Sequence, residues 1–258
     1  MDSLTNQQYW DDVWAAGEVP SVDIAQNPHQ RELDVRFRRY LKPGARFLEV
    51  GVGASAWPAH VARQTGAEAW GIDFSRPGLD SAQRAADRAG VSVRLVQGDL
   101  FDGAALPARA FDLVYSGGFI EHFEDPTPVM RRLGELVRDG GVVLTTVPNL
   151  RGVNGALQKW ADPEVYAKHI VHTCESLDRA HAAGGMVPVE PARYLGAMDV
   201  SSVNFSQRFV ALPKPLQAVL WRSMSLSRVM ANGMLRVVRK TDGGERFAPA
   251  ILGIYRRE

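Results

Sequence analysis

The sequence predicts an α/β fold in which helices cover both faces of a mostly parallel sheet. From Arg46 onward, short apolar segments alternate with amphipathic ones, which is typical of strands joined by crossover helices. A glycine-containing turn follows the first apolar segment, and an acidic residue stands at the end of each of the next two. Ligands of such folds bind at the carboxyl ends of the strands, so these residues mark the expected site.

The expected elements follow one another in regular order. Strands are predicted at Arg46–Val50, Ala69–Asp73, Val93–Gln97, Phe111–Ser116 and Gly141–Val147, with helices at Trp57–Thr65, Arg76–Ala89 and Thr127–Val137. Two later strands are expected at Met186–Tyr194 and Ala248–Arg256. The chain therefore divides into an N-terminal helical lid (1–45), a ligand-binding core (46–150) and a cover that also supplies the last strands of the same domain (151–258).

Composition excludes several classes of protein. Apolar residues make up 45% of the 258 and charged residues 23%, which is typical of a globular chain rather than a disordered one. The single cysteine, Cys174, excludes a cysteine-rich zinc site and favours a reducing, cytoplasmic setting. The net charge of +1 does not indicate a nucleic-acid binder. The N-terminal residues lack the order of a signal peptide, and no apolar run approaches the ~20 residues that span a bilayer.

A glycine turn follows the first predicted strand, in the segment Phe47–Ser55. Glycines at 51 and 53 let the backbone turn tightly and approach a ligand closely, although a purely structural turn is also consistent with them. The spacing to Ala56 and Asp73 even satisfies the relaxed dinucleotide fingerprint. A nicotinamide-dependent oxidoreductase is therefore a second interpretation, but no hydride-site signature is recognisable.

Three carboxylates stand near the ends of successive strands. Glu49 lies two positions before the first glycine, where a ligand with a free ammonium group would favour an anion. Asp73 ends the second strand and Asp99 follows the third. One of these acids can accept hydrogen bonds from both hydroxyls of a ribose and the other from an adenine amine. A single acid at a strand end is often only a helix cap, but three in register with a glycine turn predict a ligand site.

Five segments together resemble the ordered motifs of class I S-adenosylmethionine-dependent methyltransferases. They are Glu49–Ser55, Gly71–Asp73, Gly98–Leu100, Phe111–Ser116 and Asp139–Asn149, and they occur in the order and spacing of that family. Phe119–Pro126 and the Pro148-Asn149 ending further resemble the ubiquinone-biosynthesis O-methyltransferase group and its small-molecule relatives. One departure is visible, because Ser55 stands where the family has a third glycine.

The resemblance implies a Rossmann-like sheet of seven strands, the last of them antiparallel, and S-adenosylmethionine as the cofactor. It also implies a set of cofactor contacts. Glu49, Gly51 and Gly53 would hold the methionine part, Asp73 with Phe74 the ribose region, Asp99 and Leu100 the adenine, while Ser116 and Gly117 would face the sulfonium and Trp14 would belong to an aromatic lid. The alternative for Trp14 is an amphipathic helix that simply packs on the sheet.

The expected reaction is in-line transfer of a methyl group, in a closed pocket, to a hydroxyl or carboxyl oxygen of a small molecule. A histidine suits the role of general base, and His122 follows the fourth strand at the methyl end, with Glu121 beside it. His169 and His172 are expected to contact the acceptor. At a spacing of three they could share a helical face and bind a metal, but no third ligand is evident, so we expect none. His181 is expected on a helix surface.

The C-terminal segment is strongly basic. Between Ser201 and Glu258, ten Lys or Arg stand against three Asp or Glu, a local net charge of +7. Leu216–Lys240 can be a packed lid helix, a roof from which one or two of Arg222, Arg228 and Arg236 bind an anionic group of the acceptor, or a helix that lies on an anionic membrane. An arginine in the cleft, no arginine in the cleft, or an uncovered apolar stripe would distinguish the three. N-methylation and a cofactor-binding protein without transferase activity remain the alternative functions.

Overall fold

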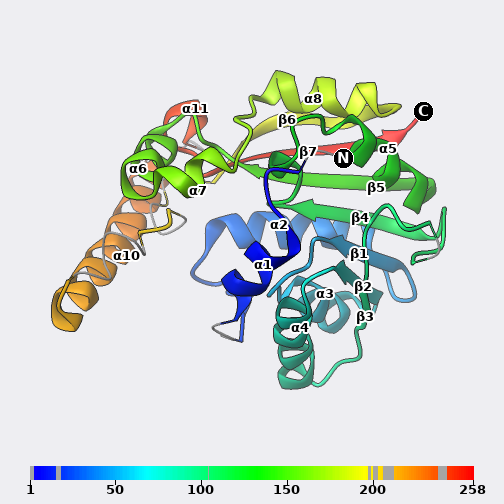
Figure 1. Ribbon diagram of the computed structural model, residues 1–258, viewed down its shortest axis with the longest axis horizontal. Coiled ribbons are helices and arrows are strands. Elements are labelled where there is room, and N and C mark those ends of the chain that lie inside the picture. Colours follow the sequence, from blue (N-terminus) through cyan, green and yellow to red (C-terminus); the bar gives the residue numbers. More distant parts are fainter. Residues whose placement is uncertain are drawn as a thin grey trace.

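A seven-stranded sheet runs through the centre of the computed structural model, which describes residues 3–15, 19–103, 105–196, 199, 203–205, 212–237 and 243–258. The strand order is β3-β2-β1-β4-β5-β7-β6 (Figure 1). Strand β7 is antiparallel to both of its neighbours, and the other strands run parallel to one another. The predicted fold class is therefore confirmed, and so is the antiparallel last strand.

The strands and helices fall close to their predicted positions. The strands are β1 (Arg46–Val50), β2 (Glu68–Asp73), β3 (Arg94–Gln97), β4 (Phe111–Gly117), β5 (Val137–Pro148), β6 (Met186–Leu195) and β7 (Ala250–Arg257). The helices are α1 (Gln7–Trp14), α2 (Pro28–Tyr40), α3 (Trp57–Thr65), α4 (Arg76–Ala89), α5 (Thr127–Leu136), α6 (Val153–Ala161), α7 (Pro163–Ala167), α8 (Cys174–Ala183), α10 (Lys214–Val237) and α11 (Gly244–Phe247), with a 3-10 turn at Ile120–His122. Strand β5 begins before the predicted Gly141 because Val137 already pairs with Phe111 of β4.

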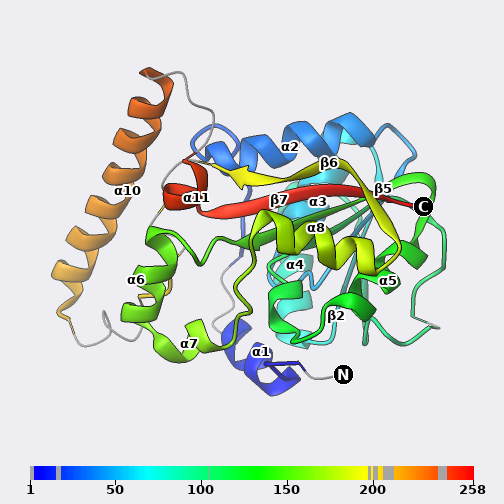
Figure 2. The same ribbon diagram turned by 90° about the horizontal axis from the view of Figure 1, so that it is seen from above.

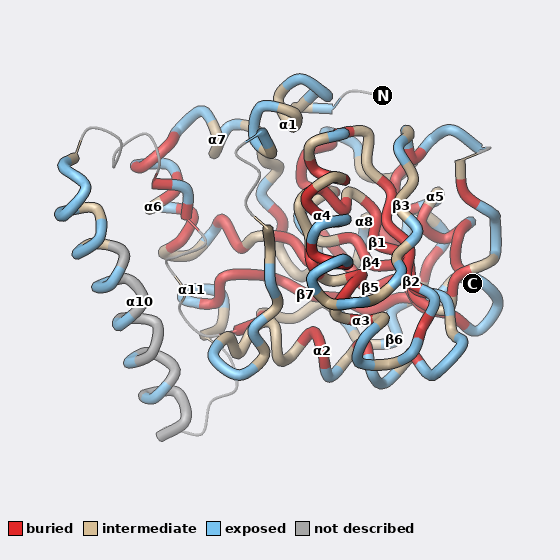
Figure 3. Tube along the Cα trace, turned by 90° about the horizontal axis from the view of Figure 1, so that it is seen from below, coloured by how far each residue is buried: buried red, intermediate tan, exposed pale blue. Residues whose placement is uncertain are grey.

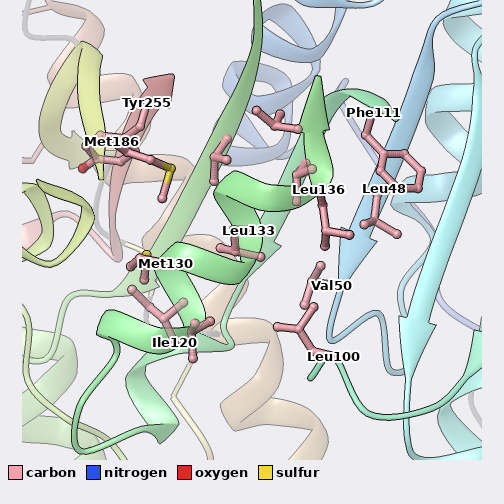
Figure 4. Close-up of a cluster of buried hydrophobic side chains, with 14 of the residues drawn as sticks. Leu48, Val50, Leu100, Phe111, Ile120, Met130, Leu133, Leu136, Met186 and Tyr255 are labelled. Carbon is pink, nitrogen blue, oxygen red and sulfur yellow. The ribbon is translucent and has the colours of Figure 1, made fainter. Parts of the chain in front are cut away.

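Each face of the sheet carries its own apolar core. Alternation along β1 sends Leu48 and Val50 to one face, where they pack with side chains of α5 and α8 (Figure 4). It sends Phe47 to the opposite face, where Leu33 and Phe37 of α2 and Val61 of α3 pack against it. Glu49 shares this second face, so the alternation of the strand places its carboxylate at the edge of the α2–α3 core.

The two N-terminal helices have different roles in the fold. The side chain of Asn6 caps α1 by accepting a hydrogen bond from the backbone N–H of Tyr9, and α1 buries none of its residues. Asn27 caps α2 in the same way, at the N–H of Gln30, and α2 buries Leu33 and Phe37 in the core. Helix α2 therefore belongs to the core, whereas α1 lies on the surface of the described chain.

His181 is buried rather than exposed, which corrects the expectation of a surface position. Its ring stacks on that of Tyr255 at 3.5 Å, and its Nε2 lies 3.0 Å from the hydroxyl of Thr145. The backbone carbonyl of Leu177 lies 2.9 Å from its Nδ1, and the hydroxyl of Tyr255 donates to Asp178 at 2.8 Å. Helix α8 places His181 against β5 and β7, where protein groups contact both of its ring nitrogens.

Helix α10 lies at one end of the molecule, outside the layers that sandwich the sheet (Figure 2). The burial colouring shows the strands buried at the centre and α10 with largely exposed residues where its side chains are described (Figure 3). Within the described ranges, no helix has both the length and the apolar character to cross a membrane.

Candidate functional site

Two adjoining cavities lie at the carboxyl edge of the sheet. The first has a volume of about 640 Å³ and reaches from β1 and β4 to the 3-10 turn. The second, of about 510 Å³, lies over the ends of β2 and β3. Both are lined by Gly51, Asp73, Phe74 and Phe119, so they form the two halves of one continuous cleft. This is the edge at which ligands of doubly wound folds bind.

The glycine loop after β1 depends on glycine for both backbone and space. Gly51 and Gly53 adopt φ angles of +67° and +42°, which favour glycine. A Cβ atom at Gly51 would lie 2.5 Å from the ring of Phe119, and one at Gly53 would lie 2.9 Å from the ring of Trp14. Two aromatic rings therefore stand directly on the loop, and no larger residue fits beneath them.

Asp73 fastens the glycine loop to β2. One carboxylate oxygen accepts a hydrogen bond from the N–H of Gly53 at 2.8 Å, and the other accepts from the N–H of Ser75 at 2.8 Å. Burial raises the pKa of Asp73 above its ordinary value, and these backbone hydrogen bonds oppose the shift. Each oxygen keeps a second lone pair, so the carboxylate can hold the loop and accept two hydroxyl donors from a ligand.

Glu49 is a buried carboxylate with an unpartnered oxygen. It lines the first cavity, is 4% exposed, and its Oε2 accepts no hydrogen bond from the described chain. Burial, together with the nearby charge of Asp73, raises the pKa of Glu49 to about 8. A buried carboxylate without a partner is costly unless a cation reaches it, so Glu49 is suited to an ammonium group of a ligand.

The second cavity is lined by the residues that follow β3. Asp99 and Leu100 both face it, and one oxygen of Asp99 accepts a hydrogen bond from the N–H of Phe101 at 2.9 Å. Phe74 and Phe123 add aromatic surface. A cavity with aromatic walls and the carboxylate of Asp99 beside them fits a flat heterocycle that carries an amine donor.

Glu121, His122 and His169 meet at the far side of the first cavity. His122 and His169 lie with their ring centroids 4.7 Å apart, and one potential ligand atom from each of the three residues lies within 4.8 Å of the others. Glu121 is 2% exposed with an unpartnered Oε2, and burial raises its pKa to about 8. The sequence singled out each of these residues, and the fold brings them together from two segments.

The geometry fixes which nitrogen of His122 is free. The Nδ1 atom lies 2.8 Å from the backbone carbonyl of Lys168, and since a carbonyl can only accept, Nδ1 carries the proton. Burial, together with His169, lowers the pKa of His122 to about 4. His122 is therefore neutral near pH 7, and its Nε2 is available to accept a proton or bind an acceptor.

The aromatic N-terminal segment covers this part of the cleft. The ring of Trp10 stands edge-on to His122 at 5.1 Å, and Trp10 and Trp14 stack at 5.8 Å. The N–H of Leu4 donates to the carbonyl of His122 at 2.8 Å, and the side-chain amide of Gln7 donates to the carbonyl of Phe74 at 3.1 Å. Trp10 and Trp14 both line the first cavity, so α1 lies across it.

Three predicted site residues lie elsewhere. His172 is buried but lines neither cavity, and the segment between α7 and α8 that carries it and His169 is not helical. Arg222 is exposed on α10 and lines neither cavity, because α10 stands outside the sandwich. Ser116 is fully buried beside the cleft rather than on its surface, whereas Gly117 does line it.

Sequence reasoning missed several lining residues. Asn27 and His29 reach the first cavity from the start of α2, Trp57 from the start of α3, and Asp199 from the segment after β6. The Asn27-Pro28 helix start was a visible signal, but nothing local indicated which end of the sheet it approaches. Among the described residues that line the two cavities there is no Lys or Arg, so the lining offers no cation to an anionic acceptor.

Comparison with known proteins agrees with this geometry. A family model described as a methyltransferase domain matches residues 25–189. A ubiquinone biosynthesis O-methyltransferase of Escherichia coli O9:H4 (strain HS) is 30% identical over 170 residues, which span 62% of this chain and 63% of the relative. The chain thus matches less than two thirds of that relative's length.

Two solved structures share the fold. Haemonchus contortus phosphoethanolamine N-methyltransferase 2, in complex with phosphomonomethylethanolamine and S-adenosylhomocysteine, aligns with a TM-score of 0.60 and 17% identity, over 97% of this chain and 58% of that one. The [4+2]-cyclase SpnF aligns with a TM-score of 0.62 and 18% identity, over 100% and 97%. At these identities the likeness concerns the fold.

Proposed function

This chain belongs to the methyltransferase domain family, and we propose that it transfers a methyl group from S-adenosylmethionine to a hydroxyl oxygen of a small molecule. The observation that carries the proposal is the row of carboxylates at three successive strand ends, Glu49, Asp73 and Asp99, along one continuous cleft. The unpartnered oxygen of Glu49 and the glycine loop, which leaves no room for a Cβ atom, fit the methionine end of that cofactor.

Each part of the cleft receives one part of the cofactor in this proposal. Glu49 accepts hydrogen bonds from the ammonium group, and Asp73 accepts them from the ribose hydroxyls. Asp99 and Leu100 hold the adenine in the second cavity, and Gly117, which lines the first, lies near the sulfonium. S-adenosylmethionine supplies an electrophilic methyl group, so the protein mainly has to align the acceptor and exclude water.

His122 acts on the acceptor. Its free Nε2 accepts the hydroxyl proton while the acceptor oxygen takes the methyl group, and the hydrogen bond from Nδ1 to Lys168 holds the ring in place. Trp10, packed against His122, closes the pocket over the reacting atoms. His169, whose ring lies 4.7 Å from that of His122, contacts the acceptor on the same side of the cavity.

The lining favours an uncharged acceptor over the anionic one that the basic C-terminal segment suggested. Carboxylates at Glu49, Asp73, Glu121 and Asp199 face the first cavity, and aromatic surface comes from Trp10 and Trp57. A free carboxylate or phosphate on the acceptor would find no Lys or Arg among the described lining residues to pair with. An amine acceptor is the second candidate, since Glu121 offers an unpartnered oxygen to it.

Ligand binding and turnover separate this proposal from the alternatives. S-adenosylhomocysteine should raise the melting temperature of the protein and NAD should not, because the cleft pairs an ammonium-binding carboxylate with a ribose-binding one. Methyl transfer to a panel of phenols, alcohols and amines then identifies the acceptor atom. Stabilisation by NAD would reject the proposal. Binding of S-adenosylhomocysteine without turnover of any acceptor in the panel would favour a cofactor-binding protein without transferase activity.

Asp73→Ala tests the ribose assignment. The loss of a charge-assisted acceptor should weaken S-adenosylhomocysteine binding by about 1.5–3 kcal/mol, roughly ten- to hundredfold, in calorimetry. It should also loosen the glycine loop, because the N–H of Gly53 loses its acceptor. Asp80→Ala on the exposed side of α4 is the matched control and should leave affinity unchanged. Equal affinities for a folded Asp73→Ala variant and the wild type would reject the assignment.

A further inference from the structure

Helix α10 carries an apolar stripe that nothing in the described chain covers. Leu216, Val219, Leu226 and Met230 are between 45% and 67% exposed, although each is a large apolar residue. Scattered single apolar residues on a surface are ordinary, but these four belong to one helix. We call these four residues the α10 stripe.

Helix geometry places the four residues on a single face. At about 100° per residue, positions 216, 219, 226 and 230 fall within an arc of about 80° along α10. Ser223 lies within the same arc and is also exposed. Ala218, which is exposed as well, lies outside this arc, about 120° around the helix from its centre. The stripe is therefore a continuous seam more than two turns long.

The charges of α10 are all of one sign. Residues 214–237 contain four basic residues, Lys214, Arg222, Arg228 and Arg236, and no Asp or Glu. Lys214 and Arg222 are exposed, and position 222 borders the stripe on the helix surface. A surface that binds this helix must therefore offer apolar groups to the α10 stripe and negative charge to the basic residue beside it.

We propose that α10 lies along the surface of an anionic phospholipid bilayer, with the α10 stripe at the boundary between headgroups and acyl chains. A helix that lies in the membrane interface has an apolar face flanked by Lys or Arg, and it need not be long enough to cross the bilayer. Each Lys or Arg near an anionic surface strengthens membrane binding by about 1 kcal/mol. Helix α10 lies outside the sandwich (Figure 2), and the four side chains of the stripe are exposed. This inference does not depend on the proposed reaction.

A second copy of the chain fits the stripe less well. In a symmetric dimer the stripes of two α10 helices would face each other, and each helix would bring Arg222 to the edge of the contact with no acidic residue of α10 to pair it. Like charges at the rim of such an interface oppose association. The charge of α10 thus selects a lipid surface over another copy.

Vesicle flotation with the full chain tests the proposal. The protein should float with vesicles of phosphatidylglycerol and phosphatidylcholine in equal parts and remain behind with phosphatidylcholine alone. Leu226→Gln combined with Met230→Gln should lower partitioning by about tenfold or more, since both side chains leave the apolar layer. The partitioning of Ala218→Gln, which lies outside the stripe, should stay within about twofold of that of the wild type. Arg222→Gln should lower partitioning by about fivefold.

Three outcomes would overturn the proposal. The first is the absence of flotation with either vesicle. The second is equal partitioning of the stripe variant and the Ala218→Gln control, with circular dichroism showing that both retain their helix content. The third is a dimer in light scattering that the stripe variant converts to a monomer, which would assign the stripe to a second copy. S-adenosylhomocysteine affinity, measured on the same samples, reports separately on the cofactor cleft.

Discussion

Two groups of buried polar side chains differ in how they are partnered. Tyr255 and His181 have protein partners for their side-chain polar atoms: the Tyr255 hydroxyl donates to Asp178, and the ring nitrogens of His181 contact Thr145 and the backbone. Around the first cavity, Glu49 and Glu121 each keep a buried oxygen without a partner. The hydrogen bonds of the first group join β7 and β5 to α8, whereas each carboxyl group of the second keeps one oxygen that no hydrogen bond of the described chain uses.

The difference indicates which buried polar atoms are available to bind a ligand. A buried polar atom with no partner lowers stability, and it persists where a ligand supplies the missing partner. Substitutions in the Tyr255 group should therefore change stability and leave ligand binding unchanged. Substitutions around the cavity should do the reverse, and the four experiments below test this, from the largest expected effect to the smallest.

His122→Ala should give the largest change, in turnover. Removal of the base should lower kcat by about 10²-fold or more, with little change in S-adenosylhomocysteine affinity, because Nε2 acts on the acceptor. The measurement is steady-state methyl transfer with the acceptor found in the panel. Turnover close to that of the wild type would leave His122 with only a positioning role. Loss of turnover in the presence of a metal chelator would instead indicate that Glu121, His122 and His169 bind a metal ion.

Glu49→Gln should weaken binding and stabilise the free protein. Without the carboxylate, calorimetric affinity for S-adenosylhomocysteine should fall by roughly tenfold or more. The wild-type carboxyl has its pKa raised from 4.5 to about 8, so its folded form loses stability as pH rises through that range. The variant lacks this loss and should be more stable at pH 7 by on the order of 1–3 kcal/mol in urea unfolding. A destabilised variant with normal affinity would contradict the comparison.

Tyr255→Phe should show the opposite pattern. It removes the hydroxyl that donates to Asp178 and keeps the ring that stacks on His181. The free energy of unfolding should fall by about 1–2 kcal/mol, whereas S-adenosylhomocysteine affinity should not change, because Tyr255 lines neither cavity. A large loss of affinity would show that the two groups are coupled through the sheet.

His181→Gln should flatten the dependence of stability on pH. Burial lowers the pKa of His181 from 6.5 to about 3, so the unfolded chain takes up a proton that the folded protein refuses. Stability is therefore lost as pH falls below about 6.5, by about 1.4 kcal/mol per pH unit for one proton. Urea unfolding from pH 7 to pH 4 should show a slope smaller by that amount in the variant. Parallel slopes would mean that His181 titrates normally.

The sequence predicted the sheet, and it predicted which strand-end residues meet at the cleft, because both depend on local signals. Glu49, Gly51 and Asp73 stand at strand ends, and strand ends of a parallel sheet meet at one edge whatever the loops do. The rest depends on long-range placement. His29 enters the cavity because of where α2 packs, and His181 is buried because of where α8 packs. The position of α10 keeps Arg222 out of the lining, and the segment after β6 brings Asp199 into it. Residue type and spacing do not encode those directions.

The placement of Phe119 at the waist of the cleft has a consequence for inhibitor design. Its ring stands over Gly51 and lines both cavities, so the two parts of the cleft adjoin at Phe119. Adenosine alone should occupy the compartment at Asp99, and an amine with an aromatic tail should occupy the compartment at Glu121. A linker that threads past Phe119 would join the two fragments, and the second would then bind at the effective concentration set by the first. The length of that linker, rather than the affinity of either fragment, would decide selectivity among enzymes with the same glycine loop.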